Sequence, residues 1–528
     1  MLIPEKCTVL VVGGGPGGSY TAAVLAREGI DTVLLEADKF PRYHVGESML
    51  PSLRHYLRFV DLDSAFDKHG FNKKNGAAFK MSPTNREGFT DFLAAGGPGN
   101  YSWNVIRSEA DEMIFRHAGA SGAKTFDGVK VKSIDFDSSN GTTNGTTNGT
   151  ANGDAHSASQ NPGRPISATY TKKADNTSGV IKFDYIVDAS GRVGLLNTKY
   201  LKNRHYNTTL KNVANWAYFE DAGLYGGGTA RSGAPFFEAL RDESGWAWFI
   251  PLHDGTHSIG VVMNQDIATE RKATAASAQE YFDTALKQAP MLSELLGAGK
   301  QVSELKAASD YSYHSSSYAF PYARIVGDSG CFIDPFFSSG VHLALTGGLS
   351  AGTTIAASIR GHCDEAAAAQ WHSKKIREGY ARFLLVVLSA YKQMRNQKEA
   401  VLSDFNEDNF DRAFSFFKPI IQGTADATNK LTQAEFSKTI DFLTKAFSPA
   451  FRNNLDNTGD GPAPDGAEAA KPPPMDDGIS PEDREVLQAL RTHHGQNTLN
   501  LDSFTTDVID GRVPKLEKGE LTLVSVEA

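Results

Sequence analysis

Cysteine is scarce in this sequence of 528 residues. The three cysteines, Cys7, Cys331 and Cys363, lie far apart, and no Cys-x-x-Cys pair occurs. Disulfide frameworks and cysteine-based zinc sites need more numerous or more closely spaced cysteines, so neither is expected. We predict thiols that stay reduced, as in a cytoplasmic protein, and no metal site.

Positive charge and long hydrophobic runs are also in short supply. The formal net charge is -9, which argues against binding to nucleic acid or to an anionic membrane surface. The apolar runs at residues 8–12 and 383–388 are far too short to span a bilayer. The first run leads straight into glycines, as a buried strand does and a signal peptide does not. We therefore expect a cytoplasmic protein without a membrane span.

Two catalytic motifs are missing as well. The sequence contains no His-Glu-x-x-His and no phosphate-binding loop that ends in lysine and serine or threonine. These absences argue against zinc peptidases and P-loop nucleotidases.

The start of the chain carries the pattern of a dinucleotide-binding βαβ unit. An expected strand at residues 8–12 is followed by Gly-Gly-Gly-Pro-Gly-Gly at 13–18, an expected helix at 19–28 and a second strand at 32–35. The glycines let the backbone approach a pyrophosphate at a helix N-terminus, and an acid after the second strand can bind a ribose hydroxyl. The cofactor-binding residues predicted in this way are Gly13, Gly15, Gly18 and Glu36.

A later segment favours FAD over NAD. Gly327 and Asp328 follow a short apolar strand, where an acid could hold a hydroxyl of the FAD ribityl chain. Residues 334–340 read Asp-Pro-Phe-Phe-Ser-Ser-Gly and lead into an apolar helix, whose N-terminus suits an anion. Arg42 and Arg107 lie at spacings that recur in FAD-dependent aromatic hydroxylases, although each taken singly is more typical of a surface or packing residue.

The predicted fold is α/β, with a Rossmann-like FAD-binding domain, a mixed-sheet substrate lobe and C-terminal helices. Residues 138–163 are rich in Asn, Gly, Thr and Ser, and are expected to form a disordered loop between two strands. The expected division assigns residues 1–211 and 310–360 to the FAD-binding domain, 212–309 to the substrate lobe, 361–452 to the helical region, 453–482 to a linker and 483–528 to a tail.

These features together resemble the flavin-dependent halogenases. The resemblance rests on the glycine turn, Glu36, residues 42–51, Lys74, residues 334–340 and Trp-x-Trp-x-Ile-Pro at residues 246–251. The glycine turn is shared with hydroxylases and reductases, whereas Lys74 together with the tryptophan run is far more specific. More narrowly, the chain is similar to fungal halogenases of phenolic polyketides, such as those that chlorinate resorcylic-acid lactones.

The resemblance implies a chemistry and a set of roles. A separate flavin reductase supplies reduced FAD, which reacts with O2 and a halide, chloride or bromide. The resulting hypohalous acid travels through a tunnel to Lys74, which presents it to the ring as a chloramine or through a hydrogen bond. Lys73 and Lys80 compete for this role. The resemblance further implies Ser339 and Gly340 as halide-binding residues, and a partition between flavin and substrate made by Trp246, Trp248 and Pro251.

One departure from the family pattern bears on the substrate. Tryptophan halogenases have a glutamate in the segment that matches residues 335–340, and Phe337 stands at that place here. Because a phenol loses its ring proton with less help than an indole, a phenolic substrate is implied. The fungal resemblance alone implies that this substrate is free, of the polyketide type and part of secondary metabolism. The general base stays open, with His342 as one candidate.

Two other functions stay open. A single-component FAD-dependent aromatic hydroxylase would oxidise NADPH by itself and insert oxygen. A flavoprotein without catalysis would only bind a metabolite or a partner, although the residues needed for FAD and for the lysine step are all present.

Overall fold

The computed structural model describes residues 2–83, 86–137, 162–397 and 508–526. Almost all of the loop expected at 138–163, the linker at 453–482 and the helical region beyond residue 397 lie outside the described residues. Among the helices that are described, none has the length and apolar character needed to cross a bilayer.

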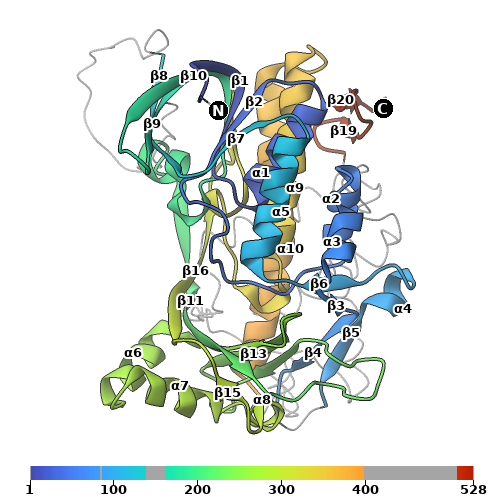
Figure 1. The fold of residues 1–528 in the computed structure, drawn as a ribbon, viewed down its shortest axis with the longest axis vertical. Coiled ribbons are helices and arrows are strands. Elements are labelled where there is room, and N and C mark those ends of the chain that lie inside the picture. The colour runs from blue at the N-terminus through green and yellow to red at the C-terminus, as the bar shows by residue number, and fades with distance from the viewer. Residues whose placement is uncertain (1, 84–85, 138–161, 398–507, 527–528) are drawn as a thin grey trace, which may run out of the picture.

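An eight-stranded sheet forms the upper part of the molecule in Figure 1. Strand β1 (Lys6–Val12) lies at its centre, parallel to β2 on one side and to β10 on the other. β1 and β2 are almost wholly buried, which explains why they read as continuous apolar runs. The strand order is β17-β18-β10-β1-β2-β7, with β9 against β10 and β8 against β9. The remaining strands are β2 (Thr32–Leu35), β7 (Lys124–Phe126), β8 (Val129–Phe136), β9 (Pro165–Lys172), β10 (Ser178–Asp188), β17 (Ala319–Phe320) and β18 (Ala323–Ile325).

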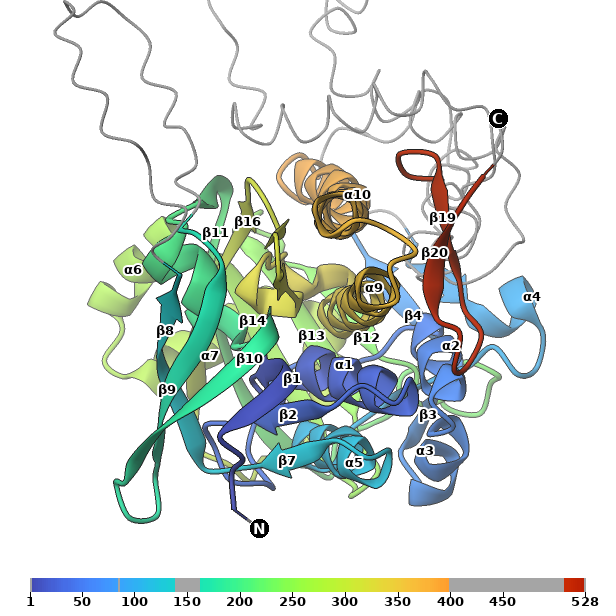
Figure 2. The same cartoon turned by 90° about the horizontal axis from the view of Figure 1, so that it is seen from above.

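Four helices pack around this sheet (Figure 2): α1 (Pro16–Arg27), α5 (Arg107–Ala120), α9 (Gly340–Ile359) and α10 (Glu365–Met394). Helix α1 begins at Pro16, inside the segment expected to be a turn, because proline is well suited to a first helical position. It ends at Arg27 and is followed by the C-cap Glu28 and by Gly29, whose φ of 75° favours glycine. The predicted strands at 8–12 and 32–35 and the helix between them are confirmed.

The second sheet lies at the lower end of the molecule (Figure 1) and has the order β15-β11-β14-β13-β12-β4-β5, with β16 against β11. All its pairs are antiparallel except β12 with β4, so it is mixed, as predicted. It includes strands from outside residues 212–309, because Ala77 and Phe79 of β4 pack into the same core as Trp246. Its strands are β4 (Gly76–Lys80), β5 (Gly88–Asp91), β11 (Arg204–Glu220), β12 (Phe236–Ala239), β13 (Gly245–Pro251), β14 (His257–Asn264), β15 (Lys300–Gln301) and β16 (Lys306–Ser315).

Smaller elements complete the described fold. Helices α6 (Gln265–Thr274), α7 (Ala278–Leu286) and α8 (Pro290–Leu296) lie along the lower edge of the second sheet in Figure 1. A two-stranded sheet of β3 (Asn72–Lys74) and β6 (Ser102–Asn104) adjoins helices α2 (Ser52–Phe59) and α3 (Asp63–His69), while α4 (Phe92–Gly96) follows β5. The hairpin of β19 (Arg512–Lys515) and β20 (Thr522–Ser525) packs on α9 (Figure 2).

Candidate active site

A cavity of about 650 Å³ lies between the two large sheets, beyond the carboxyl end of β1. In sheets of this kind, cofactors bind beyond the carboxyl ends of the parallel strands. The cavity brings together most of the predicted site residues, which come from distant parts of the sequence. Those that line it are Gly13, Gly15, Gly18, Glu36, Arg42, Arg107, Trp246, Trp248, Gly327, Asp328 and Gly340.

The glycine turn offers open backbone to this cavity. Gly13 has a φ of 103°, a conformation that favours glycine. A Cβ atom on Gly15 would contact only Arg42, at 3.5 Å, and would otherwise occupy cavity space. Gly15 caps α1 without a side-chain hydrogen bond, so the N–H groups of the first turn are available to an anion. This arrangement fits the pyrophosphate of FAD.

Glu36 is held in place by two backbone N–H groups. Gly14 N donates to Oε2 at 2.5 Å and Asp38 N donates to Oε1 at 2.7 Å. Each carboxylate oxygen has a second lone pair, so the side chain can still accept hydrogen bonds from a ribose.

Two arginines share a single carboxylate beside the cavity. Arg42 Nη1 lies 3.1 Å from Asp111 Oδ2, and Arg107 Nε donates to Asp111 Oδ1 at 2.8 Å. Burial works against the charged form of Asp111, but the Arg107 guanidinium outweighs it and lowers the pKa of that carboxyl. Arg42 Nε also lies 4.0 Å from Glu36 Oε1, and both arginines line the cavity, where a guanidinium can bind a phosphate.

Asp328 borders the cavity on a single 3₁₀ turn, Gly327–Ser329. Burial raises the pKa of Asp328, while the positive charges of Arg192, Arg107 and Arg204 oppose that shift. A carboxylate in this setting can accept a hydrogen bond from a ligand hydroxyl, as expected for the ribityl chain.

The predicted tryptophan pair lies on β13, with ring centroids 5.8 Å apart. Trp246 Nε1 donates to Tyr391 Oη at 2.9 Å, and Trp248 Nε1 donates to Ser258 Oγ at 3.1 Å. Both rings are therefore fixed at the cavity wall. Pro251 does not belong to the described lining of the cavity; its carbonyl accepts hydrogen bonds from Asn72 and Asn104, both at 3.1 Å.

A buried hydrogen-bonded network, which no sequence pattern predicted, supports this wall. Tyr391 Oη donates to Asp334 Oδ2 at 2.6 Å and accepts from Trp246. Asn212 Nδ2 lies 2.9 Å from Tyr391 Oη and 3.2 Å from Asp334 Oδ2. The network joins β11, β13 and α10 to the segment that begins at Asp334.

Ser339 and Gly340 form the start of α9. Ser339 is fully buried, and its Oγ has no hydrogen-bond partner among the described residues. A Cβ on Gly340 would meet no atom within 4 Å, and Gly340 faces the cavity. An unpaired buried hydroxyl, open space and a helix N-terminus suit a small anion such as a halide.

The structure distinguishes the three candidate lysines. Lys74 is 1% exposed, whereas Lys73 is exposed with its Nζ over the Tyr101 ring, and Lys80 is half-buried. Lys74 Nζ donates to Ser48 Oγ at 2.8 Å and to Met49 O at 2.9 Å. Burial lowers the pKa of Lys74 to about 7.

Ser48 connects this amine to the cavity. Lys74 is not part of the described lining, but Ser48 is. Ser48 pairs with Asn104 of β6, and β6 pairs on its other side with β3, where Lys74 lies opposite Ser102. Ser48 is a functional candidate that the sequence did not single out, because only its contact with Lys74 marks it.

The other two residues considered for the substrate side, Phe337 and His342, are both buried. Phe337 packs on Phe336 and Phe79, with centroids 4.9 and 5.4 Å away. His342 is buried, with Nδ1 2.8 Å from Ser52 Oγ, and does not belong to the described lining of the cavity.

Comparison with known proteins gives a consistent result. The sequence matches the tryptophan halogenase family over residues 8–118 and 140–443. It is 60% identical to the flavin-dependent halogenase ascD of Acremonium egyptiacum, over all of this chain and 94% of the relative. It is 50% identical to the sulochrin halogenase gedL of Aspergillus terreus, over 99% of this chain and 94% of that protein.

Among solved structures, the fold is similar to that of the flavin-dependent halogenase CmlS. The TM-score is 0.64 at 24% identity, with 86% of this chain and 78% of the other covered.

Proposed function

The chain belongs to the tryptophan halogenase family of flavin-dependent halogenases, and from this premise we propose that it halogenates a free phenolic aromatic through Lys74. The enzymes of this family use FAD, O2 and a halide. The observation that carries the proposal is a fully buried lysine whose amine contacts a serine at the edge of the flavin-sized cavity.

The overall reaction consumes reduced FAD, O2, a halide, a proton and an aromatic C–H, and yields FAD, two molecules of water and a carbon–halogen bond. Bound reduced FAD supplies, with O2, the oxidation of the halide. Reduced FAD comes, in our proposal, from a separate reductase. The residues proposed to hold the cofactor are the cavity-lining glycines, Glu36, the Arg42 and Arg107 pair, and Asp328.

Lys74 is proposed to act as a neutral amine. Its two hydrogen bonds, to Ser48 Oγ and Met49 O, use both hydrogens of an NH2 group and leave the lone pair free, whereas an ammonium would have a third hydrogen. The lone pair bonds to the halogen of hypohalous acid as the oxygen–halogen bond breaks, and the departing hydroxide takes one proton from the amine and leaves as water. The ring carbon then takes the halogen, the nitrogen–halogen electron pair returns to Nζ together with a proton, and the ring proton is lost.

The surrounding residues protect this sequence of steps. Trp246 and Trp248 are proposed to keep the substrate from the flavin and to exclude water, because rigid rings fixed by hydrogen bonds make a dry wall. Ser339 and Gly340 are proposed to hold the halide, as the unpaired Ser339 hydroxyl suggests.

Phe337 is the residue from which we infer a phenolic substrate. This buried ring stands where halogenases that act on tryptophan have a glutamate, and its neighbours Phe79 and Phe336 are apolar too. A ring that needs no carboxylate to lose its proton fits such a site. One relative, 50% identical, is named as a halogenase of sulochrin.

The test combines the protein with reduced FAD from a generic reductase, O2, chloride and a resorcinol-type phenol. Chlorinated product is expected, and Lys74→Ala should abolish it while flavin binding and oxidation persist. Lys73→Ala is the matched control and should retain chlorination, because Lys73 is exposed and its Nζ lies over the Tyr101 ring instead of against Ser48. A hydroxylated product, halide-independent turnover or NADPH oxidation by the protein alone would instead identify a hydroxylase.

A further inference from the structure

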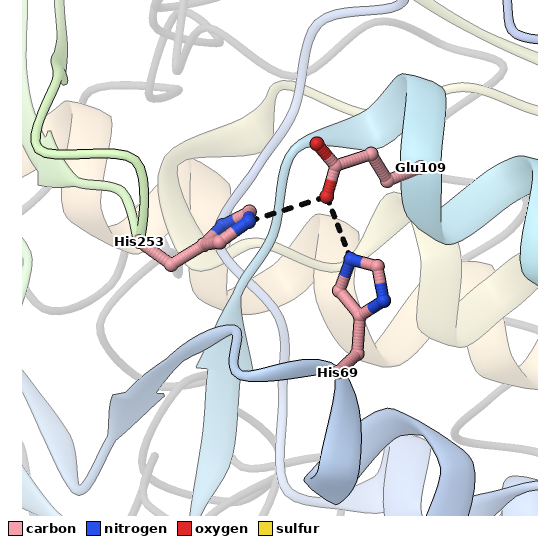
Figure 3. Close-up of side chains that lie close together, drawn as sticks. All are labelled: His69, Glu109 and His253. Atoms are coloured by element: carbon pink, nitrogen blue, oxygen red, sulfur yellow. Dashed lines mark hydrogen bonds and ion pairs between the residues drawn. The ribbon is translucent and has the colours of Figure 1, made fainter.

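A second cluster of reactive side chains lies outside the cavity. His69 from the end of α3, Glu109 from the first turn of α5 and His253 from the turn after β13 point toward one another (Figure 3). His69 Nε2 lies 2.7 Å and His253 Nε2 lies 3.2 Å from the same oxygen, Glu109 Oε2. All three potential ligand atoms lie within 4.8 Å of one another.

An aromatic ring fixes both imidazoles. The buried Phe71 has its centroid 4.3 Å from that of His69 and 5.3 Å from that of His253, the latter at an interplanar angle of 90°. Side chains held in this way lose little freedom on binding a ligand. The cluster is therefore organised before any ion binds.

We propose that His69, Glu109 and His253 bind a divalent transition-metal ion, with Zn²⁺ as the best match, at a site separate from the flavin cavity. Two imidazole nitrogens and one carboxylate oxygen are a donor set that zinc favours. Ligand atoms around a tetrahedral zinc, bonded at about 2.0–2.1 Å, lie roughly 3.3 Å apart. The two nitrogen–oxygen distances here, 2.7 and 3.2 Å, are at or below that value, and no pair of ligand atoms is more than 4.8 Å apart.

Solvent can complete the coordination. The side chains of His69, Glu109 and His253 are 33%, 37% and 20% exposed, so water can enter and occupy the remaining positions. Binding requires both imidazoles to be neutral, with the hydrogen of each on Nδ1, so that the Nε2 lone pairs bind the ion in place of the present contacts with the carboxylate.

The position of the site gives the ion a structural consequence. His69 precedes the β3 strand that ends in Lys74, Glu109 follows Arg107 on α5, and His253 follows Pro251 at the end of β13. The ion would tie together three segments that carry the proposed lysine, phosphate-binding and partition residues. The Pro251 carbonyl already links two of these regions through Asn72.

Zinc binding by the full-length, untagged protein tests the proposal. After removal of metals with a chelator, the protein is titrated with ZnCl2, and bound zinc is counted by mass spectrometry after gel filtration. One zinc per chain is expected, and Co²⁺ should give visible d–d absorption. Zinc at a hundredfold excess over its Kd should lower the unfolded fraction about hundredfold.

Two pairs of variants locate the ion. Glu109→Gln and His69→Ala should lower zinc affinity more than about tenfold, since loss of even an outer-shell partner costs about 10–100-fold. Glu112→Gln, on the same helix but outside the cluster, and the exposed His205→Ala should bind zinc normally. Should His69→Ala fail to fold, the isosteric Glu109→Gln decides alone.

No stoichiometric zinc, or zinc that Glu109→Gln retains at full affinity, would overturn the proposal. The readouts are zinc content, absorption and thermal unfolding, none of which depends on halogenation. A failure of the proposed halogenase chemistry would therefore leave this test unaffected, and the reverse also holds.

Discussion

At the scale of single residues, the buried amine of Lys74 should make halogenation depend on pH. Burial lowers its pKa to about 7, so the neutral, nucleophilic fraction grows as the pH rises through 7. We expect kcat for chlorination to increase about tenfold per pH unit below pH 7 and to level off above it. The measurement is product formation against pH with preformed reduced FAD.

The control for this pH profile is the rate of flavin oxidation without substrate. This rate should not show the tenfold rise per pH unit below pH 7, because Lys74 is not involved in it. A chlorination rate that falls above pH 7 would contradict the neutral amine and indicate an ammonium that donates a hydrogen bond.

The choice between Lys73 and Lys74 shows what the sequence alone leaves open. Neighbouring residues on a strand face opposite sides, so one of the two had to point inward, but a three-residue strand carries no pattern that says which. The answer depends on β6, which pairs with β3 and with Ser48. Such pairing joins residues that are distant in the sequence, and no local sequence pattern reports it.

At the scale of elements, features built from residues close together in the sequence were predicted well, whereas features built from distant segments were not. The βαβ unit was predictable because its strands, glycines and acid lie within one short stretch. The recruitment of β4 and β5 into the second sheet was not, because it rests on packing of Phe79 against Phe237 and Phe336. The cluster around Glu109 was missed for the same reason, since its ligands come from three separate segments.

The network around Tyr391 is the element-scale feature with a direct consequence for catalysis. Tyr391→Phe leaves the Trp246 N–H and the Asn212 amide with one partner fewer in a buried setting. Each unpaired buried group costs about 1–3 kcal/mol. We expect lower stability and a lower yield of chlorinated product per reduced FAD consumed, because the wall between flavin and substrate loosens.

The measurement is the amount of chlorinated product and of released hydrogen peroxide per reduced FAD consumed, determined in the same reaction. Tyr281→Phe is the control, since its hydroxyl donates to the Met263 sulfur at 3.5 Å, in a core cluster separate from the one that holds Trp246 and Tyr391. Equal coupling in the two variants would refute the role given to the network.

At the scale of the whole molecule, the last described segment returns to the first domain. Arg360 Nη1 donates to Leu521 O at 2.6 Å, and Glu28 accepts from Gly519 N at 2.9 Å and from Leu521 N at 3.0 Å. Leu523 is buried in the core cluster formed by α1 and α9. The sequence suggested only an uninformative tail here, because so short a hairpin has no periodicity of its own.

This hairpin should contribute to the stability of the flavin-binding domain. Leu523 is 2% exposed, and its neighbour Val524, on the opposite face of β20, is 37% exposed. Leu523→Ala removes a buried side chain and should lower the free energy of unfolding by about 2–5 kcal/mol. Val524→Ala should change it by less than about 0.5 kcal/mol, as is usual at the surface. Urea unfolding, monitored through the release of flavin, measures the free energy of unfolding of both variants. Equal unfolding midpoints for Leu523→Ala and Val524→Ala would show that the hairpin does not stabilise this domain.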